Sequence, residues 1–149
     1  NDWREVYKTA QAAFLMSLGA GVVITASICL AGVPIASIFT TSDQVAALFL
    51  SFLPCFACYQ LGDCLQTVYA NALRAIEDVK SMMLYAFVAY CLISIPLAYV
   101  FAFPVGLGAV GIWWSFPFGL TAAGMSFFFQ FRKNVSRRLQ AQNVPLGLS

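Results

Sequence analysis

The amino-acid sequence predicts an all-α integral membrane protein with four transmembrane helices. Hydrophobic residues make up 61% of the chain and charged residues 9%, against about 25% charged residues in soluble proteins. Four apolar runs each reach the roughly 20 residues that cross about 30 Å of hydrocarbon. A chain of 149 residues could not cover four such helices with polar surface, which excludes a soluble bundle. The predicted spans are 10–39, 45–73, 82–103 and 107–131.

The cationic residues predict the orientation of these spans. All eight lie before the first span, between the second and third, or after the fourth, and the loops 40–43 and 103–106 carry none: Arg4, Lys8, Arg74, Lys80, Arg132, Lys133, Arg137 and Arg138. The positive-inside rule therefore places both termini and the loop between the second and third spans in the cytoplasm. We expect an integral protein of the inner (plasma) membrane. We expect these cations to contact the headgroups of membrane lipids and expect no nucleic-acid partner.

Local sequence features predict where the transmembrane region ends, where the second helix begins and where helices bend. Residues 1–133 are expected to form the four-helix transmembrane region, and residues 134–149, which lose apolar periodicity, a flexible cytoplasmic tail. Thr41 followed by Gln44 has capping-box spacing, which predicts the start of the second helix. Four prolines fall within spans and predict local bends: Pro34, Pro54, Pro96 and Pro117.

Small residues recur every fourth position in the last span. They predict a smooth strip along which another helix backbone can approach closely. The strip consists of Gly111, Ser115, Gly119 and Ala123.

Asp63 is the candidate functional residue, because it lies near the middle of the second apolar span. A carboxylate at that depth costs about 2.5–3.5 kcal/mol on insertion scales, so such residues usually face a polar cavity on an ion or substrate pathway. At 100° per residue, further polar side chains share its face of the helix. The predicted lining residues beside Asp63 are Tyr59, Gln66, Thr67 and Asn71.

A structural interpretation of these residues stays open. A buried acid can satisfy its hydrogen bonds on a neighbouring helix and hold the bundle together, and Thr67 and Asn71 can join helices in the same way. Cys55 and Cys58 have C-x-x-C spacing, but the chain has no histidine and no second pair to complete a metal site. The chain also lacks phosphate-loop and catalytic-triad motifs, so we expect no enzyme, no metal and no cofactor.

Several segments together resemble the multidrug and toxic compound extrusion (MATE) family. The segment from Gln60 to Val68 and the following Leu73-Arg74 and Glu77-Asp78 pairs are similar to the family's tenth helix and the loop after it. There the pattern is an Asp, a Gln three residues later, a Leu-Arg pair and an acidic turn. The family often has glycine where this chain has Ala75. Further matches are Ile38–Thr41, Ile95–Tyr99 and Gly108–Trp113.

The resemblance implies a fragment covering the last four of twelve helices, within the C-terminal six-helix lobe. It implies a secondary active transporter that exports cationic amphipathic compounds in exchange for sodium ions or protons by alternating access. Asp63 matches the acidic residue of the family's second-lobe cation site. The implied partners are small cationic substrates, the coupling ion and the remaining helices of the full-length transporter.

Three other functions are weighed against this one. Small dimeric drug exporters also have four spans, but they carry a Glu in the first helix, where this chain has no ionisable residue between Lys8 and Asp43. Flippases of lipid-linked saccharides share the larger architecture but use a more cationic cavity. A non-transporting membrane assembly subunit would pair Asp63 permanently with a partner helix.

Overall fold

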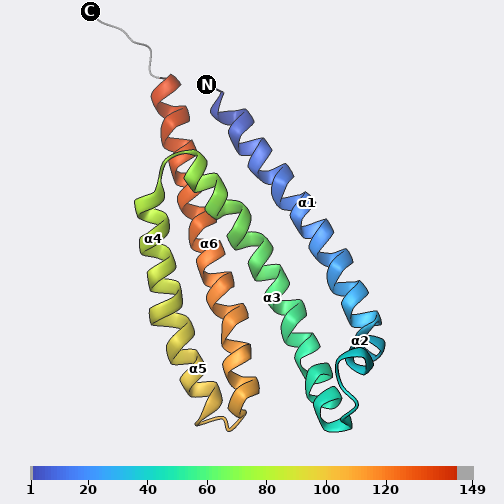
Figure 1. The fold of residues 1–149 in the computed structure, drawn as a ribbon. Helices are drawn as coiled ribbons and strands as arrows, with labels where there is room; N and C mark the ends of the chain where they lie inside the picture. The colour runs from blue at the N-terminus through green and yellow to red at the C-terminus, as the bar shows by residue number, and fades with distance from the viewer. Residues whose placement is uncertain (1, 144–149) are drawn as a thin grey trace, which may run out of the picture.

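The computed structural model describes residues 2–143, and the regular elements in this part of the chain are all helices (Figure 1). One helical rod runs from α4 through the π-helix η1 into α5 without a break. In chain order the elements are α1 (Trp3–Leu30), α2 (Gly32–Phe39), α3 (Asp43–Ala75), α4 (Val79–Phe87), η1 (Val88–Ser94), α5 (Ile95–Ala102) and α6 (Gly108–Asn143).

Three helical segments of the described chain are long and apolar enough to cross a membrane: Trp3–Leu30, Asp43–Ala75 and Val79–Ala102. Large apolar side chains such as Met16 and Leu30 lie 75% and 86% exposed on their outer faces, as suits contact with lipid. These features agree with the predicted all-α membrane class. The predicted fourth span, 107–131, falls within α6, which is long enough but is not one of these three apolar segments.

The first predicted span, 10–39, is divided into two helices. α1 ends at Leu30, Ala31 forms a turn, and α2 begins at Gly32. Pro34 therefore lies in the first turn of α2, where an amide has no intrahelical partner and its absence costs little. The proline bend expected within one helix is instead a break three residues earlier.

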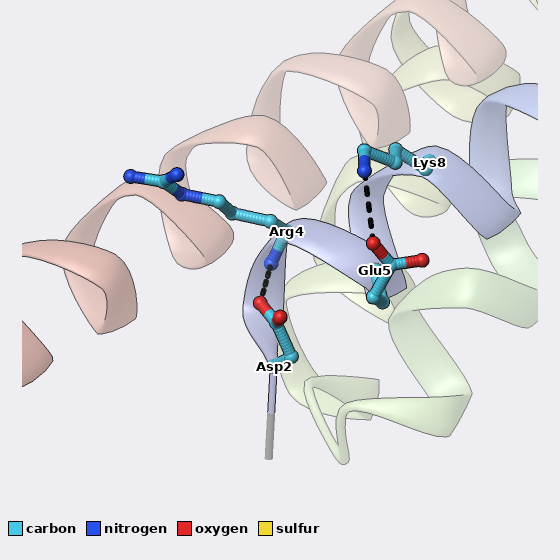
Figure 2. Close-up of polar contacts among 4 residues, drawn as sticks. All are labelled: Asp2, Arg4, Glu5 and Lys8. Atoms are coloured by element: carbon cyan, nitrogen blue, oxygen red, sulfur yellow. Dashed lines mark hydrogen bonds and ion pairs between the residues drawn. The ribbon is translucent and has the colours of Figure 1, made fainter.

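All eight cations lie toward one end of the bundle. The start of α1, the turn between α3 and α4, and the end of α6 meet at the top of Figure 1, whereas the other two turns lie at the bottom. Figure 2 shows the start of α1, where the Asp2 carboxylate caps the helix by accepting a hydrogen bond from the Arg4 amide at 3.1 Å. Lys8 pairs with Glu5 at 2.8 Å on the same helix.

α3 packs closely along α6. A methyl group added at Gly62 would lie 2.9 Å from the Thr121 hydroxyl oxygen, and one at Gly124 would lie 2.9 Å from the Gln66 backbone nitrogen. The two backbones can approach only because both positions lack a side chain. Toward the cationic end, an aromatic cluster of buried side chains continues the contact: Tyr69, Phe127 and Phe131.

The small-residue strip of α6 packs against the rod formed by α4, η1 and α5, as the sequence predicts. A methyl group at Gly111 would lie 2.6 Å from the Phe101 carbonyl oxygen, and one at Gly119 would lie 2.8 Å from the Ser94 Cβ atom. Ser115, which lies between these two glycines, and Ala123, one turn beyond Gly119, are both buried. α6 therefore lies between α3 and this rod and contacts both.

The start of α3 and the end of α6 differ from the sequence predictions, and α3 ends in a tight turn. The α3 N-cap is Ser42, which makes no side-chain capping bond, so the predicted capping box does not form. At the other end, Asp78 and Glu77 donate amide hydrogen bonds to the carbonyls of Leu73 and Arg74, with Glu77 left-handed at φ 64°. α6 continues helical to Asn143 through much of the segment predicted as a flexible tail, and residues 144–149 lie outside the described residues.

Gly111→Ala tests the packing of α6 on α5. The added methyl group meets backbone atoms of Phe101 and Ala102, which cannot rotate away, so we expect a loss of about 1–3 kcal/mol of stability. Gly19→Ala is the matched control, because no atom lies within 4 Å of its added methyl group. Thermal unfolding in detergent measures both, and equal melting temperatures for the two variants would contradict the close contact.

Candidate functional site

The polar face predicted from the sequence lies on one uninterrupted helix. α3 is α-helical from Asp43 to Ala75, so the positions four and three residues either side of Asp63 share its side of the helix. Tyr59, Asp63 and Gln66 are half-buried, whereas Thr67 and Asn71 are exposed.

Contacts on either side of Asp63 fix where this face points. Gly62 packs against Leu120 and Thr121 of α6. Cys64 lies toward α1, where its thiol donates to the Ser17 carbonyl oxygen at 3.4 Å and its sulfur lies against Gly21. Since successive residues point 100° apart on a helix, Asp63 is directed between the contacts with α6 and with α1.

The hydrogen bonds of this part of α3 involve other side chains. Gln60 donates to the Cys64 sulfur at 3.8 Å, and Arg74 donates to the Asn71 amide oxygen at 3.1 Å. Within residues 2–143 none of these bonds includes the Asp63 carboxylate. The permanent pairing of Asp63 that a purely structural role requires is therefore not made inside this segment.

Two cavities adjoin the ends of the polar face. One, of about 650 Å³, includes Tyr59 in its wall and is otherwise apolar, with Phe52, Phe56 and Trp113 among its lining residues. The other, of about 520 Å³, lies between α1 and α3 and includes Asn71 and Glu5. Asp63, Gln66 and Thr67 line neither cavity, so the predicted lining role of Gln66 and Thr67 stays a prediction.

The π-helix η1 is a feature of the third span that sequence reasoning missed. Pro96 predicts a disturbed helix there but not the wider turns of η1 that precede it. Ser94 of η1 is buried against Gly119 of α6.

A second polar cluster lies at the cationic end, outside the apolar segments. Asp78 precedes α4 and accepts hydrogen bonds from Gln130 and Asn134 of α6, and Gln130 also donates to the Ser81 hydroxyl. Burial raises the pKa of the Asp78 carboxyl, but the hydrogen bonds from Ser81, Gln130 and Asn134 outweigh burial, and the pKa lies below its ordinary value of 3.8. This cluster ties the turn between α3 and α4 to α6.

Comparison with known proteins decides the family. The sequence pattern of the MatE family matches residues 1–100, which is two thirds of the chain and includes Asp63, the α3–α4 turn and η1. The chain belongs to the MatE family. This match confirms the family resemblance that was inferred from the segments around Asp63 and Arg74.

Two relatives of this MatE chain carry the same name. The chain is 32% identical over 106 residues to "Probable multidrug resistance protein NorM" of Pseudomonas putida, which covers 71% of this chain and 22% of that protein. It is 32% identical over 130 residues to the protein of the same name in Bacillus subtilis, covering 87% and 29%. The chain therefore spans less than a third of the length of either relative.

Asp78→Asn tests the cluster at the end of this MatE segment. We expect the variant to be less stable than the wild type by about 1–2 kcal/mol at pH 7, because charge-assisted hydrogen bonds weaken. Since the folded-state pKa is below the unfolded value near 3.8, the carboxylate contributes its stability above that pH and loses it as the pH falls through the folded pKa.

Melting temperatures in detergent between pH 7 and pH 3 check this expectation. The difference between wild type and Asp78→Asn should shrink as the pH falls below about 4. Glu77→Gln, which removes the neighbouring exposed carboxylate, serves as the control and should not reproduce the pattern. A difference between wild type and Asp78→Asn that stays constant with pH would show that Asp78 does not act through its charge.

Proposed function

We propose that this chain is part of a secondary active multidrug efflux transporter. The complete protein would exchange cationic amphipathic compounds for sodium ions or protons by alternating access. Support comes from membership of the MatE family and from relatives named as multidrug resistance proteins. The apolar helices agree with an integral membrane protein.

The observation that carries the proposal is the position of Asp63. It lies on an apolar membrane-spanning helix, half-buried, between the contacts of α3 with α6 and with α1, and without a hydrogen-bond partner inside the described segment. A carboxylate at that depth is costly unless water, an ion or another part of the protein meets it. The remaining helices of the full-length transporter would close the space in front of Asp63 into a cavity.

In the proposed mechanism Asp63 binds the coupling cation in one state and releases it as substrate enters or leaves the cavity. Tyr59, Gln66, Thr67 and Asn71 carry neutral side-chain oxygens along the same face, which can serve as further ligands of a hard cation beside the carboxylate. The aromatic walls beyond Tyr59 offer an apolar surface for the body of an amphipathic substrate.

We propose that α6 is the fourth span and that the cationic end of the bundle is cytoplasmic. α6 has 36 residues, which correspond to about 54 Å of helix, and runs from the end without cations to the cationic end (Figure 1). A helix that joins those two ends beside α3 must cross the same layer. The positive-inside rule then places both ends of this segment in the cytoplasm of a cell with an inner (plasma) membrane.

Asp63→Asn in the complete transporter tests the function. Drug-dependent cation exchange is measured in proteoliposomes under separate sodium and proton gradients. We expect exchange to fall to the level of empty liposomes, because an amide cannot compensate the charge of the cation, and the gradient that drives the wild type identifies the coupling ion.

Asp43→Asn is the matched control for this experiment. It removes an exposed carboxylate from the first turn of the same helix, at the end without cations, and should leave exchange unchanged. If Asp63→Asn inserts correctly and exchanges as fast as Asp43→Asn, the coupling role of Asp63 is wrong.

A further inference from the structure

We propose that Trp113 of α6 is a specificity-determining residue, because it lines a pocket that binds the flat aromatic body of a substrate whose positive group lies at Asp63. The pocket is the cavity of about 650 Å³ that includes Tyr59 in its wall. This inference rests on the proposed transport function. It adds which part of the molecule selects among cationic substrates.

One stripe of α3 joins this pocket to Asp63. Phe52, Phe56, Tyr59 and Asp63 follow one another at intervals of four, three and four residues, and α3 is α-helical through all of them. At 100° per residue their side chains leave the helix within an arc of about 60°. Asp63 lies about 6 Å along the axis from Tyr59 and about 10.5 Å from Phe56. The carboxylate is therefore on the same side of α3 as the aromatic wall, one helical turn beyond it.

The break between α1 and α2 supplies a second wall of the pocket. Ile28, before the break at Ala31, and Ile35, after it, both line the cavity. Gly32 lets α2 lie close to α3, since a methyl group added there would be 2.8 Å from the Leu53 Cδ1 atom. The short helix α2 therefore stays beside α3 and encloses the pocket.

Trp113 is the residue that α6 contributes to the pocket. The Cys55 thiol donates a hydrogen bond to the Trp113 carbonyl oxygen at 3.3 Å, which ties the backbone of α6 to α3 at this point. The indole ring packs near the rings of Phe52 and Phe116, with centroid distances of 5.7 and 5.9 Å. Trp113 nevertheless stays 54% exposed, so its ring offers surface for a further aromatic contact.

The distribution of polar groups identifies the occupant of the pocket. Its lining is apolar apart from the Tyr59 hydroxyl and the Cys55 thiol, and Asp63 is the one charged residue between Asp43 and Arg74. A flat aromatic cation matches both features, because its rings are buried among aromatic side chains while its charge is compensated by the carboxylate. A lipid acyl chain or an apolar helix would fill the cavity but leave the charge of Asp63 uncompensated.

Binding of two cations to the complete protein in detergent tests the role of Trp113. The probes are proflavine, which is a flat aromatic cation, and tetrapropylammonium, which has no ring. The Kd of each is measured by equilibrium dialysis for the wild type and Trp113→Leu. We expect the Kd of proflavine to rise about 3- to 10-fold in the variant, as for the loss of one aromatic contact, and that of tetrapropylammonium to change less than about 2-fold.

Phe118→Leu is the matched control, because Phe118 lies near the same end of α6, is 50% exposed and does not line the pocket. It should leave both Kd values unchanged, and Trp113→Phe, which keeps a ring, should retain most of the affinity for proflavine. An equal rise in Kd for Trp113→Leu and Phe118→Leu, or an equal rise for the two cations, would overturn the inference. So would a wild type that does not bind proflavine.

Thiol labelling of Ile35→Cys distinguishes the occupants of the pocket. In the complete protein with its native cysteines replaced, a small hydrophilic thiol reagent is applied with and without proflavine. We expect the variant to react and proflavine to slow the reaction. No reaction in either condition would show that another helix or lipid fills the pocket, and a reaction that proflavine leaves unchanged would show an open pocket that does not bind it. Either result would overturn the inference.

These outcomes are separate from those that decide the proposed function. If Asp63→Asn abolishes exchange while Trp113→Leu binds proflavine as tightly as the wild type, the inference about Trp113 is overturned and the proposed function stands. If Asp63→Asn exchanges normally, the proposed function itself fails.

Discussion

The close approach of α3 and α6 is the constraint on which the rest of the structure depends. Gly62 and Gly124 bring the two backbones together where a methyl group would meet a neighbouring atom at 2.9 Å. That contact fixes the rotation of α3 and directs Asp63 to one side of it. α6 also contacts η1 through Gly119, so one helix packs against both α3, which carries Asp63, and the π-helix. Close packing of small residues, rather than a hydrophobic driving force, joins helices in lipid.

Two acidic residues of this structure, Asp78 and Asp63, have different surroundings. Asp78, at the cationic end, has its hydrogen bonds satisfied by Gln130 and Asn134 and ties a turn to α6. Asp63, within the apolar segment, has no such partner in the described residues and is only half-buried. In a folded membrane protein, a satisfied acid is structural, and an unsatisfied one needs water, an ion or another part of the protein. This contrast is the physical basis for the proposed function of Asp63.

The sequence predicts the features that depend on composition and helical periodicity. The all-helical membrane class, the shared face of Tyr59, Asp63 and Gln66, and the gathering of cations at one end follow from hydropathy, a 100° repeat and the order of the spans. The break at Ala31 and the π-helix before Pro96 do not, because a proline indicates a disturbed helix without specifying how the backbone adapts. An α-helical register likewise does not predict that Ala89 and Ser94, five residues apart, are both buried.

Accessibility of the polar face from water tests the account most directly. In the complete protein, with its native cysteines replaced, including the five of this chain, Thr67→Cys would be labelled by a small hydrophilic thiol reagent, with Ala123→Cys as the buried control. If the Asp63 face of α3 borders a cavity open to water, Thr67→Cys reacts, the coupling cation or a drug slows the reaction, and Ala123→Cys stays unreactive. Labelling of Thr67→Cys that is as slow as that of Ala123→Cys, with no effect of cation or drug, would contradict it.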